Sequence, residues 1–136
     1  MGVYTDAESL YCYMGQMFNV AFETEDLGDR LRASGVAVRL HHTDPDATIS
    51  IDFGKGVVEF GDDSTVAADV DLYMTADTAH RFWLGKVNVP LAVAKGTIKS
   101  KGSMAKVLKL APVMTPLFGK YEEILREAGL GELLDR

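Results

Sequence analysis

The sequence has little cysteine, no long apolar run and, over about a third of its length, no acid. Its single cysteine, Cys12, cannot form an internal disulfide, so a reducing compartment such as the cytoplasm fits. No apolar run approaches the roughly 18 to 20 residues that span a bilayer. The first residues lack the basic and apolar regions of a signal peptide, so we expect none. A disulfide scaffold and a transmembrane helix are therefore not expected.

Acidic residues are missing between residues 78 and 121, where 8 bases occur. Residues 1–77, in contrast, hold 15 acids and 4 bases. The whole chain has a net charge of -6, which argues against general nucleic-acid binding. Two interpretations of the acid-free window stay open. It is a solvated basic face that balances the acidic half, or a surface that meets an anionic headgroup or membrane.

The chain is long enough to bury a sizeable core as one domain over residues 1–136. Apolar residues at helical spacing predict a helix from Asp6, as N-cap, to Phe22. A second helix is expected from Glu25 to Gly35. Alternating apolar residues then predict four strands, which we expect to form an antiparallel meander at 36–42, 47–54, 57–60 and 68–74.

The second half of the sequence alternates helices with one more strand. We expect a helix capped by Thr75 or Asp77, another capped by Asn88, and a basic strand at 96–101. A helix over 104–110 should end at Pro112, and the apolar tail includes a possible lid at 119–136. The predicted class is α+β, with a five-stranded, mainly antiparallel sheet and helices on one face.

Enzyme constellations are absent from the sequence. His41 and His42 are neighbours on a predicted strand, so their side chains point to opposite faces and cannot easily share a metal ion. No nucleophile elbow, phosphate-binding loop or dinucleotide fingerprint occurs. We therefore expect no catalysis, no metal and no cofactor. One alternative function is an enzyme that acts on an apolar substrate. It would be favoured if a polar pair such as His80 and Asp77 faced a cavity.

Four motifs together carry a resemblance to a known family. They are ADVDLYMT at 68–75, a helix that ends in Trp83-Leu-Gly-Lys, KGTIKSKG at 95–102 and SMAKVLKL at 103–110. In this spacing the chain, over roughly residues 20–112, resembles the sterol-carrier-protein-2 family of lipid-binding domains. The resemblance implies helices over a hydrophobic tunnel that takes sterols, fatty acids, acyl-CoAs or similar lipids. It implies non-enzymatic binding and transfer of one such lipid.

The resemblance and the apolar pattern together give a set of candidate site residues. Methionine adapts to varied ligand shapes, although ordinary core packing explains Met74, Met104 and Met114 equally well. Trp83 is the candidate mouth residue, because its ring is apolar and its N–H needs a partner. The full candidate lining is Phe53, Val58, Phe60, Leu72, Met74, Phe82, Trp83, Met104, Val107, Leu108, Met114, Leu117 and Phe118.

Three lysines are candidates for holding a charged headgroup or touching a membrane: Lys101, Lys106 and Lys109. The expected partners are one small hydrophobic ligand and, transiently, an anionic membrane surface. The alternative function is an accessory protein that presents a hydrophobic intermediate to a biosynthetic or membrane enzyme. Neither the particular lipid nor the oligomeric state follows from the sequence.

Overall fold

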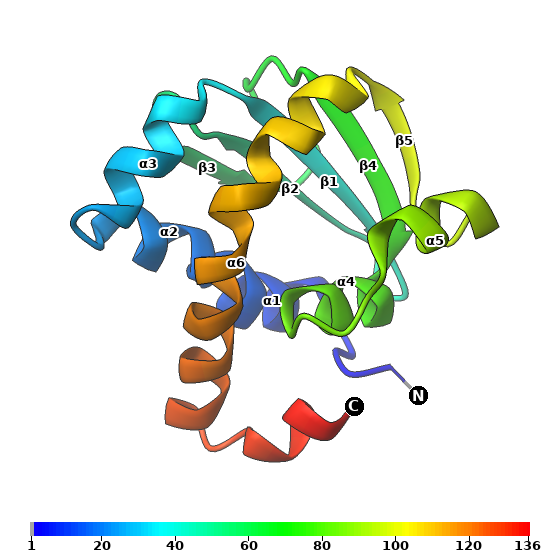
Figure 1. The fold of residues 1–136 in the computed structure, drawn as a ribbon. Helices are drawn as coiled ribbons and strands as arrows, with labels where there is room; N and C mark the ends of the chain where they lie inside the picture. The colour runs from blue at the N-terminus through cyan, green and yellow to red at the C-terminus, as the bar shows by residue number, and fades with distance from the viewer. Residues whose placement is uncertain (1) are drawn as a thin grey trace.

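A computed structural model describes residues 2–136, apart from the side chains at positions 104, 107 and 113. Helices gather on one face of a five-stranded sheet (Figure 1). The strands are β1 (Ala37–Thr43), β2 (Ala47–Asp52), β3 (Val57–Phe60), β4 (Val70–Thr75) and β5 (Lys99–Gly102). This is the α+β architecture that the sequence predicts, with the helices on the predicted single face.

The sheet is mixed, which corrects the expected four-stranded meander. The strand order is β3-β2-β1-β4-β5, and β4 pairs with β1 in parallel while the other three pairings are antiparallel. Parallel neighbours cannot be joined by a tight turn. Residues 61–69 instead cross the sheet, where Arg39 donates to the carbonyl of Val66 and Thr48 Oγ1 donates to Asp62 Oδ1 at 3.1 Å.

The first helical segment runs in three pieces from Ala7 to Glu23. These are α1 (Ala7–Leu10), a π-helical turn η1 (Tyr11–Gly15) and α2 (Gln16–Glu23). Asp6 caps the start by accepting a hydrogen bond from the Ser9 N–H at 2.8 Å. The apolar residues at helical spacing form a buried face as predicted, because all five are fully buried: Leu10, Met14, Met17, Phe18 and Ala21. Helix α3 (Leu27–Ser34) follows and ends at Gly35 in the left-handed conformation.

Two short helices and one long helix complete the layer. Thr75, rather than Asp77, caps α4 (Ala76–Trp83), and Asn88 caps α5 (Val89–Lys95) as predicted. Ser103 caps α6, which runs unbroken over Met104–Glu127. Pro112 therefore does not end this helix, which corrects the expected boundary. Figure 1 shows α6 changing direction midway, as expected near Pro112 and Pro116, since each proline lacks a backbone donor.

The two ends of the chain meet α4 through a buried chain of hydrogen bonds. Tyr121 Oη lies 2.5 Å from Tyr4 Oη and 2.7 Å from His80 Nδ1, while His80 Nε2 lies 2.7 Å from the carbonyl oxygen of Leu133. Leu133 belongs to a final turn, η2 (Gly131–Asp135). A carbonyl can only accept, so His80 Nε2 donates to it and Nδ1 of the neutral ring accepts from Tyr121. Tyr121 in turn accepts from Tyr4.

Burial favours the neutral forms of the three side chains in this hydrogen-bond network. Desolvation raises the pKa of Tyr4 to about 12, raises the pKa of Tyr121 further, and lowers the pKa of His80. Together with the buried Leu133, these contacts hold residues 119–136 against α4 and the N-terminal segment. None of the described residues in 119–136 lines the cavity considered next.

Candidate lipid-binding cavity

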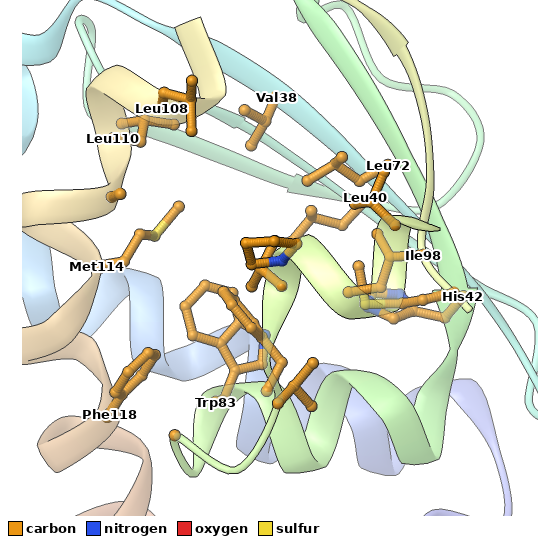
Figure 2. A pocket seen from close by; sticks show the side chains of 18 of the residues that line it. Val38, Leu40, His42, Leu72, Trp83, Ile98, Leu108, Leu110, Met114 and Phe118 are labelled. Atoms are coloured by element: carbon orange, nitrogen blue, oxygen red, sulfur yellow. The ribbon is translucent and has the colours of Figure 1, made fainter. Parts of the chain in front are cut away.

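A cavity of about 560 Å³ opens between the sheet and the helices α4, α5 and α6. Its floor is the helix-facing side of β1 and β4, where alternation puts every second side chain inward. Figure 2 shows Val38, Leu40 and Leu72 on that floor, facing Met114 and Phe118 of α6. Phe18 of α2 and Phe53, just after β2, also line the cavity. Further walls come from α4, α5 and the segments that follow them: Phe82, Trp83, Gly85, Val87, Val89, Pro90, Val93 and Ile98.

The cavity has an exposed side, and we call it the mouth. Among the lining residues Gly85, Pro90, Leu108 and Ala111 are solvent-exposed. They belong to the α4–α5 connection, α5 and the first turns of α6. Leu108 is 68% exposed, a high value for a leucine, and Leu91 of α5 is 50% exposed. The cavity thus communicates with solvent between α5 and the first half of α6.

Most of the candidate lining residues with described side chains do meet around this cavity. They are Phe53, Leu72, Met74, Phe82, Trp83, Leu108, Met114 and Phe118. Val58, Phe60 and Leu117 do not line it. Phe60 lies at the sheet edge and stacks on Tyr11 with 4.8 Å between ring centroids, and Leu117 is fully buried. The side chains of Met104 and Val107 lie outside the described part of the structure.

Trp83 lies deep in the wall, which corrects its expected place at the mouth. It is 2% exposed and meets Phe18 edge to face, with ring centroids 5.3 Å apart. Phe118 meets it at 6.3 Å. Such edge-to-face aromatic contacts fix ring orientation beyond what apolar burial alone does. Trp83 therefore connects the packed core to the cavity wall.

The three candidate headgroup lysines are scattered. Lys101 pairs in register with Asp71 and sits 5.6 Å above the ring of Tyr73, on the sheet face opposite the cavity. Strand alternation causes this, and it corrects the expectation that Lys101 serves the mouth. Lys106 Nζ contacts Asp69 Oδ1 at 2.9 Å, which holds the pKa of Asp69 below its usual range. Lys109 is exposed on α6.

Polar side chains on the outer sheet face also pair with one another. His41 Nε2 lies 2.8 Å from Asp71 Oδ1, and its ring stacks on Tyr73 at 4.3 Å between centroids. His42, the next residue, lines the cavity, so the two histidines face opposite sides as predicted. Over residues 2–136, no group of three or more His, Cys, Asp or Glu side chains is placed to hold a metal ion.

His42 is a cavity residue that the candidate set did not include. It is 4% exposed, and its Nδ1 lies 2.9 Å from the carbonyl oxygen of Ala47. Burial lowers the pKa of His42 to about 4, so its ring is neutral at pH 7. The signal was present in the sequence, because His42 shares the strand parity of Val38 and Leu40.

Other lining residues carried weaker signals. Phe18, Val38, Leu40, Ile98 and Leu110 are buried apolar residues, and nothing in their spacing separates a cavity wall from a filled core. The loop and α5 positions around Pro90 depend on how a short helix settles over the sheet. A sequence pattern does not encode that position.

Comparisons with known proteins now bear on this geometry. A model of the SCP-2 sterol transfer family matches residues 18–115, which include the floor of the cavity and much of its wall. The chain belongs to the SCP-2 sterol transfer family. Lipid binding and transfer is the general role of SCP-2 domains, and they are generally non-catalytic carriers. No curated protein matches the chain significantly by sequence.

Solved SCP-2 structures share the fold. The sterol carrier protein domain 2 of Helicoverpa armigera has a TM-score of 0.61 and 21% identity, covering 81% of this chain and 88% of its own. The apo sterol carrier protein 2 of Yarrowia lipolytica has a TM-score of 0.59 and 15% identity, covering 87% and 91%. UbiJ-SCP2, named as a ubiquinone synthesis protein, has a TM-score of 0.59 and 11% identity, covering 81% and 92%.

The described residues contain no helix long and apolar enough to cross a membrane. Two leucines are exposed on the helices that flank the mouth, Leu91 on α5 and Leu108 on α6.

Proposed function

We propose that this SCP-2 protein binds one elongated lipid in its cavity and carries it, without catalysis, between membranes. The observation that supports this is the apolar cavity of about 560 Å³ with one exposed side. That volume falls in the range of roughly 300 to 1,000 Å³ typical of small-molecule sites. The lipid is a fatty acyl, sterol or isoprenoid-like molecule, bound by one folded domain over residues 1–136.

Apolar burial supplies the affinity in this proposal. Each methylene removed from water contributes about 0.8 kcal/mol, so ten methylenes contribute about 8 kcal/mol before the cost of association. The proposed contacts are the candidate residues around the cavity: Phe53, Leu72, Met74, Phe82, Trp83, Leu108, Met114 and Phe118. These apolar side chains make few directional contacts, so they select mainly for the shape of the lipid.

We further propose that the mouth docks transiently on an anionic membrane. Leu108 lines the mouth and is exposed, and Leu91, Lys95 and Lys109 are exposed on the two helices that flank the mouth. The acid-free window from 78 to 121 contains all four residues. Positive charge next to exposed leucines attracts the anionic leaflet, while the acidic remainder of the chain turns away from it. A cytoplasmic site, which suits the exposed and unpaired Cys12, is part of this proposal.

The experiment combines binding with transfer. Delipidated protein is titrated with a fluorescent fatty acid, which other lipids then displace, and transfer is followed from labelled donor vesicles to acceptor vesicles. We expect displaceable binding and faster transfer to acceptors with anionic lipid. Absence of binding by every lipid class would overturn the proposal.

Matched variants separate binding from docking. Lys109→Glu, which places an acid beside the mouth, should slow transfer severalfold and leave lipid affinity unchanged. Lys55→Glu is the control, because Lys55 is exposed in the β2–β3 turn and lies outside the acid-free window. Equal transfer by both variants would contradict docking at the mouth.

A second candidate is presentation of a hydrophobic intermediate to a biosynthetic enzyme. The likeness in fold to UbiJ-SCP2, a ubiquinone synthesis protein by name, favours it. It predicts that the loaded protein delivers its lipid to an enzyme faster than to vesicles. If this protein alone speeds lipid transfer between vesicles, with no partner enzyme present, that result would favour the carrier function.

A further inference from the structure

His42 has a nitrogen without a hydrogen-bond partner in an otherwise apolar cavity. Nδ1 faces the Ala47 carbonyl oxygen at 2.9 Å, and a carbonyl only accepts, so Nδ1 carries the ring proton. Nε2 of the neutral ring is then a bare acceptor. Among the described residues it has no hydrogen-bond partner, and it is the one buried side-chain nitrogen or oxygen in this state.

An unsatisfied acceptor in this position is costly to the empty protein. Removing a polar atom from water without replacing its hydrogen bond destabilises the protein, because the hydration of that atom is lost without compensation. An apolar residue, as at Val38 and Leu40 on the same side of β1, would avoid that cost. The sequence places a histidine there instead, and no described residue donates a hydrogen bond to its Nε2.

The position of His42 fixes where a ligand group must lie to satisfy it. In Figure 2 it lies beside Ile98, on the opposite side of the cavity from Met114 and Phe118. It is buried, whereas Leu108 and Ala111 mark the exposed mouth. A group that reaches Nε2 is therefore inside the protein. Met74 is the register neighbour of His42 on β4. Because a thioether side chain is flexible, Met74 can move to make room for a ligand group beside His42.

We propose that the lipid carried by this protein bears a hydroxyl group, which donates a hydrogen bond to Nε2 of His42 inside the cavity. The inference rests on the proposed function and names its ligand class as a lipid alcohol. A neutral acceptor selects a donor, so it disfavours esters, ethers and ionised carboxylates at that point. Selection by a buried polar group is sharp, because a ligand that lacks the donor leaves the nitrogen unpaired.

The test uses four ligands that share one chain length. 1-Tetradecanol, 1-methoxytetradecane, tetradecane and tetradecanoate each compete with a bound fluorescent probe at pH 7.4. We expect the alcohol to bind about five- to tenfold more tightly than its methyl ether, which keeps the oxygen but cannot donate. In His42→Leu that preference should fall to less than twofold, while affinity for the alkane is kept or improved.

His41→Leu is the matched control, since His41 is the adjacent histidine on the outer sheet face. It should keep the wild-type preference for the alcohol. A second measurement needs no variant: the ¹⁵N resonance of His42 Nε2 in the wild-type protein should move to lower frequency with the alcohol and stay in place with the ether. This measurement decides the question if His42→Leu does not fold.

The outcomes distinguish the two proposals. Equal binding of alcohol and ether to the wild type, with an unmoved Nε2 resonance, overturns the role of His42 but leaves lipid binding intact. A preference for tetradecanoate over the alcohol also overturns it. If none of the four ligands displaces the probe, the proposed function itself fails.

Discussion

One face of the sheet carries two halves that differ in how completely side chains fill the space above it. In the packed half, α1, η1 and α2 lie over β2 and β3. There Leu10, Met14, Met17, Ile49 and Ile51 are fully buried and do not line the cavity described above. In the hollow half, α4, α5 and the first half of α6 lie over β1 and β4. Similar apolar residues there enclose about 560 Å³.

The difference between the halves comes from the shape of their helices. The packed half is covered by a nearly continuous helical segment that reaches the strands through an aromatic ring: Tyr11 of η1 stacks on Phe60 of β3 with 4.8 Å between ring centroids. The hollow half is covered by the seven-residue α5 and by a helix that contains two prolines. Hydrophobicity alone thus does not separate a core from a site.

The largest expected effect contrasts one leucine from each half. Leu10→Ala should lower the free energy of unfolding by about 2–5 kcal/mol, because Leu10 is fully buried and its removal leaves a void. Leu108→Ala should change it by less than about 0.5 kcal/mol, since Leu108 is 68% exposed. Urea unfolding measures both. Equal losses would mean that the hollow half is as tightly packed as its neighbour.

Acid should destabilise the protein through the hollow half. The pKa of His42 is about 4 in the folded state, against about 6.5 in the unfolded chain, so protons bind the unfolded state first. Stability is therefore fully present above pH 6.5 and falls as the pH drops toward 4, by on the order of 3 kcal/mol. Chemical denaturation across this range measures the loss.

His42→Leu is the matched variant for that pH profile. It should flatten the decline, leaving the part that comes from His80, whose pKa burial also lowers, and from Asp69, whose carboxylate is stabilised by Lys106. A wild-type profile that is flat between pH 6.5 and 4 would show that His42 is not buried in a neutral form.

Two register partners allow the comparison at a single level of the sheet. Val38 and Ile51 are opposite each other on β1 and β2, but only Val38 lines the cavity. Ile51→Phe should cost about 1–3 kcal/mol by overpacking. Val38→Phe should be near neutral in stability and should weaken probe binding at least tenfold. An equal loss in the free energy of unfolding for both variants would mean that there is no empty volume above β1.

The smallest expected effect concerns the buried hydrogen-bond network of Tyr4, Tyr121 and His80, which lies outside the two halves compared above. Tyr4→Phe removes the donor to Tyr121 and should cost about 1 kcal/mol. Lipid affinity should be unaffected, because neither tyrosine lines the cavity. Unfolding and probe binding, measured on the same preparation, check both halves of this expectation. A loss of binding would connect the chain ends to the site.

Alternation along strands made much of the fold predictable. The inward positions Ile49, Ile51, Leu72 and Met74 follow from a period of two, because successive side chains on a strand point to opposite faces. The same rule puts Lys101 on the outer face, since it shares the parity of Lys99, and puts His42 inside. Helix caps at Asp6 and Asn88 were also readable, since each side chain accepts from a nearby N–H.

Features that depend on contacts between distant segments were not predictable in this way. The partner of β4 is chosen by the path of residues 61–69 over the sheet, and no local pattern specifies that path. The continuation of α6 through Pro112 depends on packing against α2, α3 and β4, which outweighs the missing hydrogen bond. The cavity exists because α5 and α6 do not fill the space between them. That gap depends on how the two helices pack over the sheet, and the sequence of either helix alone does not specify it.

The two prolines of α6 bear on how a lipid enters. Neither has an N–H, so the carbonyls at positions 108 and 112 receive no helical hydrogen bond from four residues ahead. The helix is therefore least stiff where it passes from the mouth to the anchored turns around Tyr121. In the proposed carrier, the entrance would widen by a tilt of only the first turns of α6, while the buried hydrogen bonds of the anchored end stay intact.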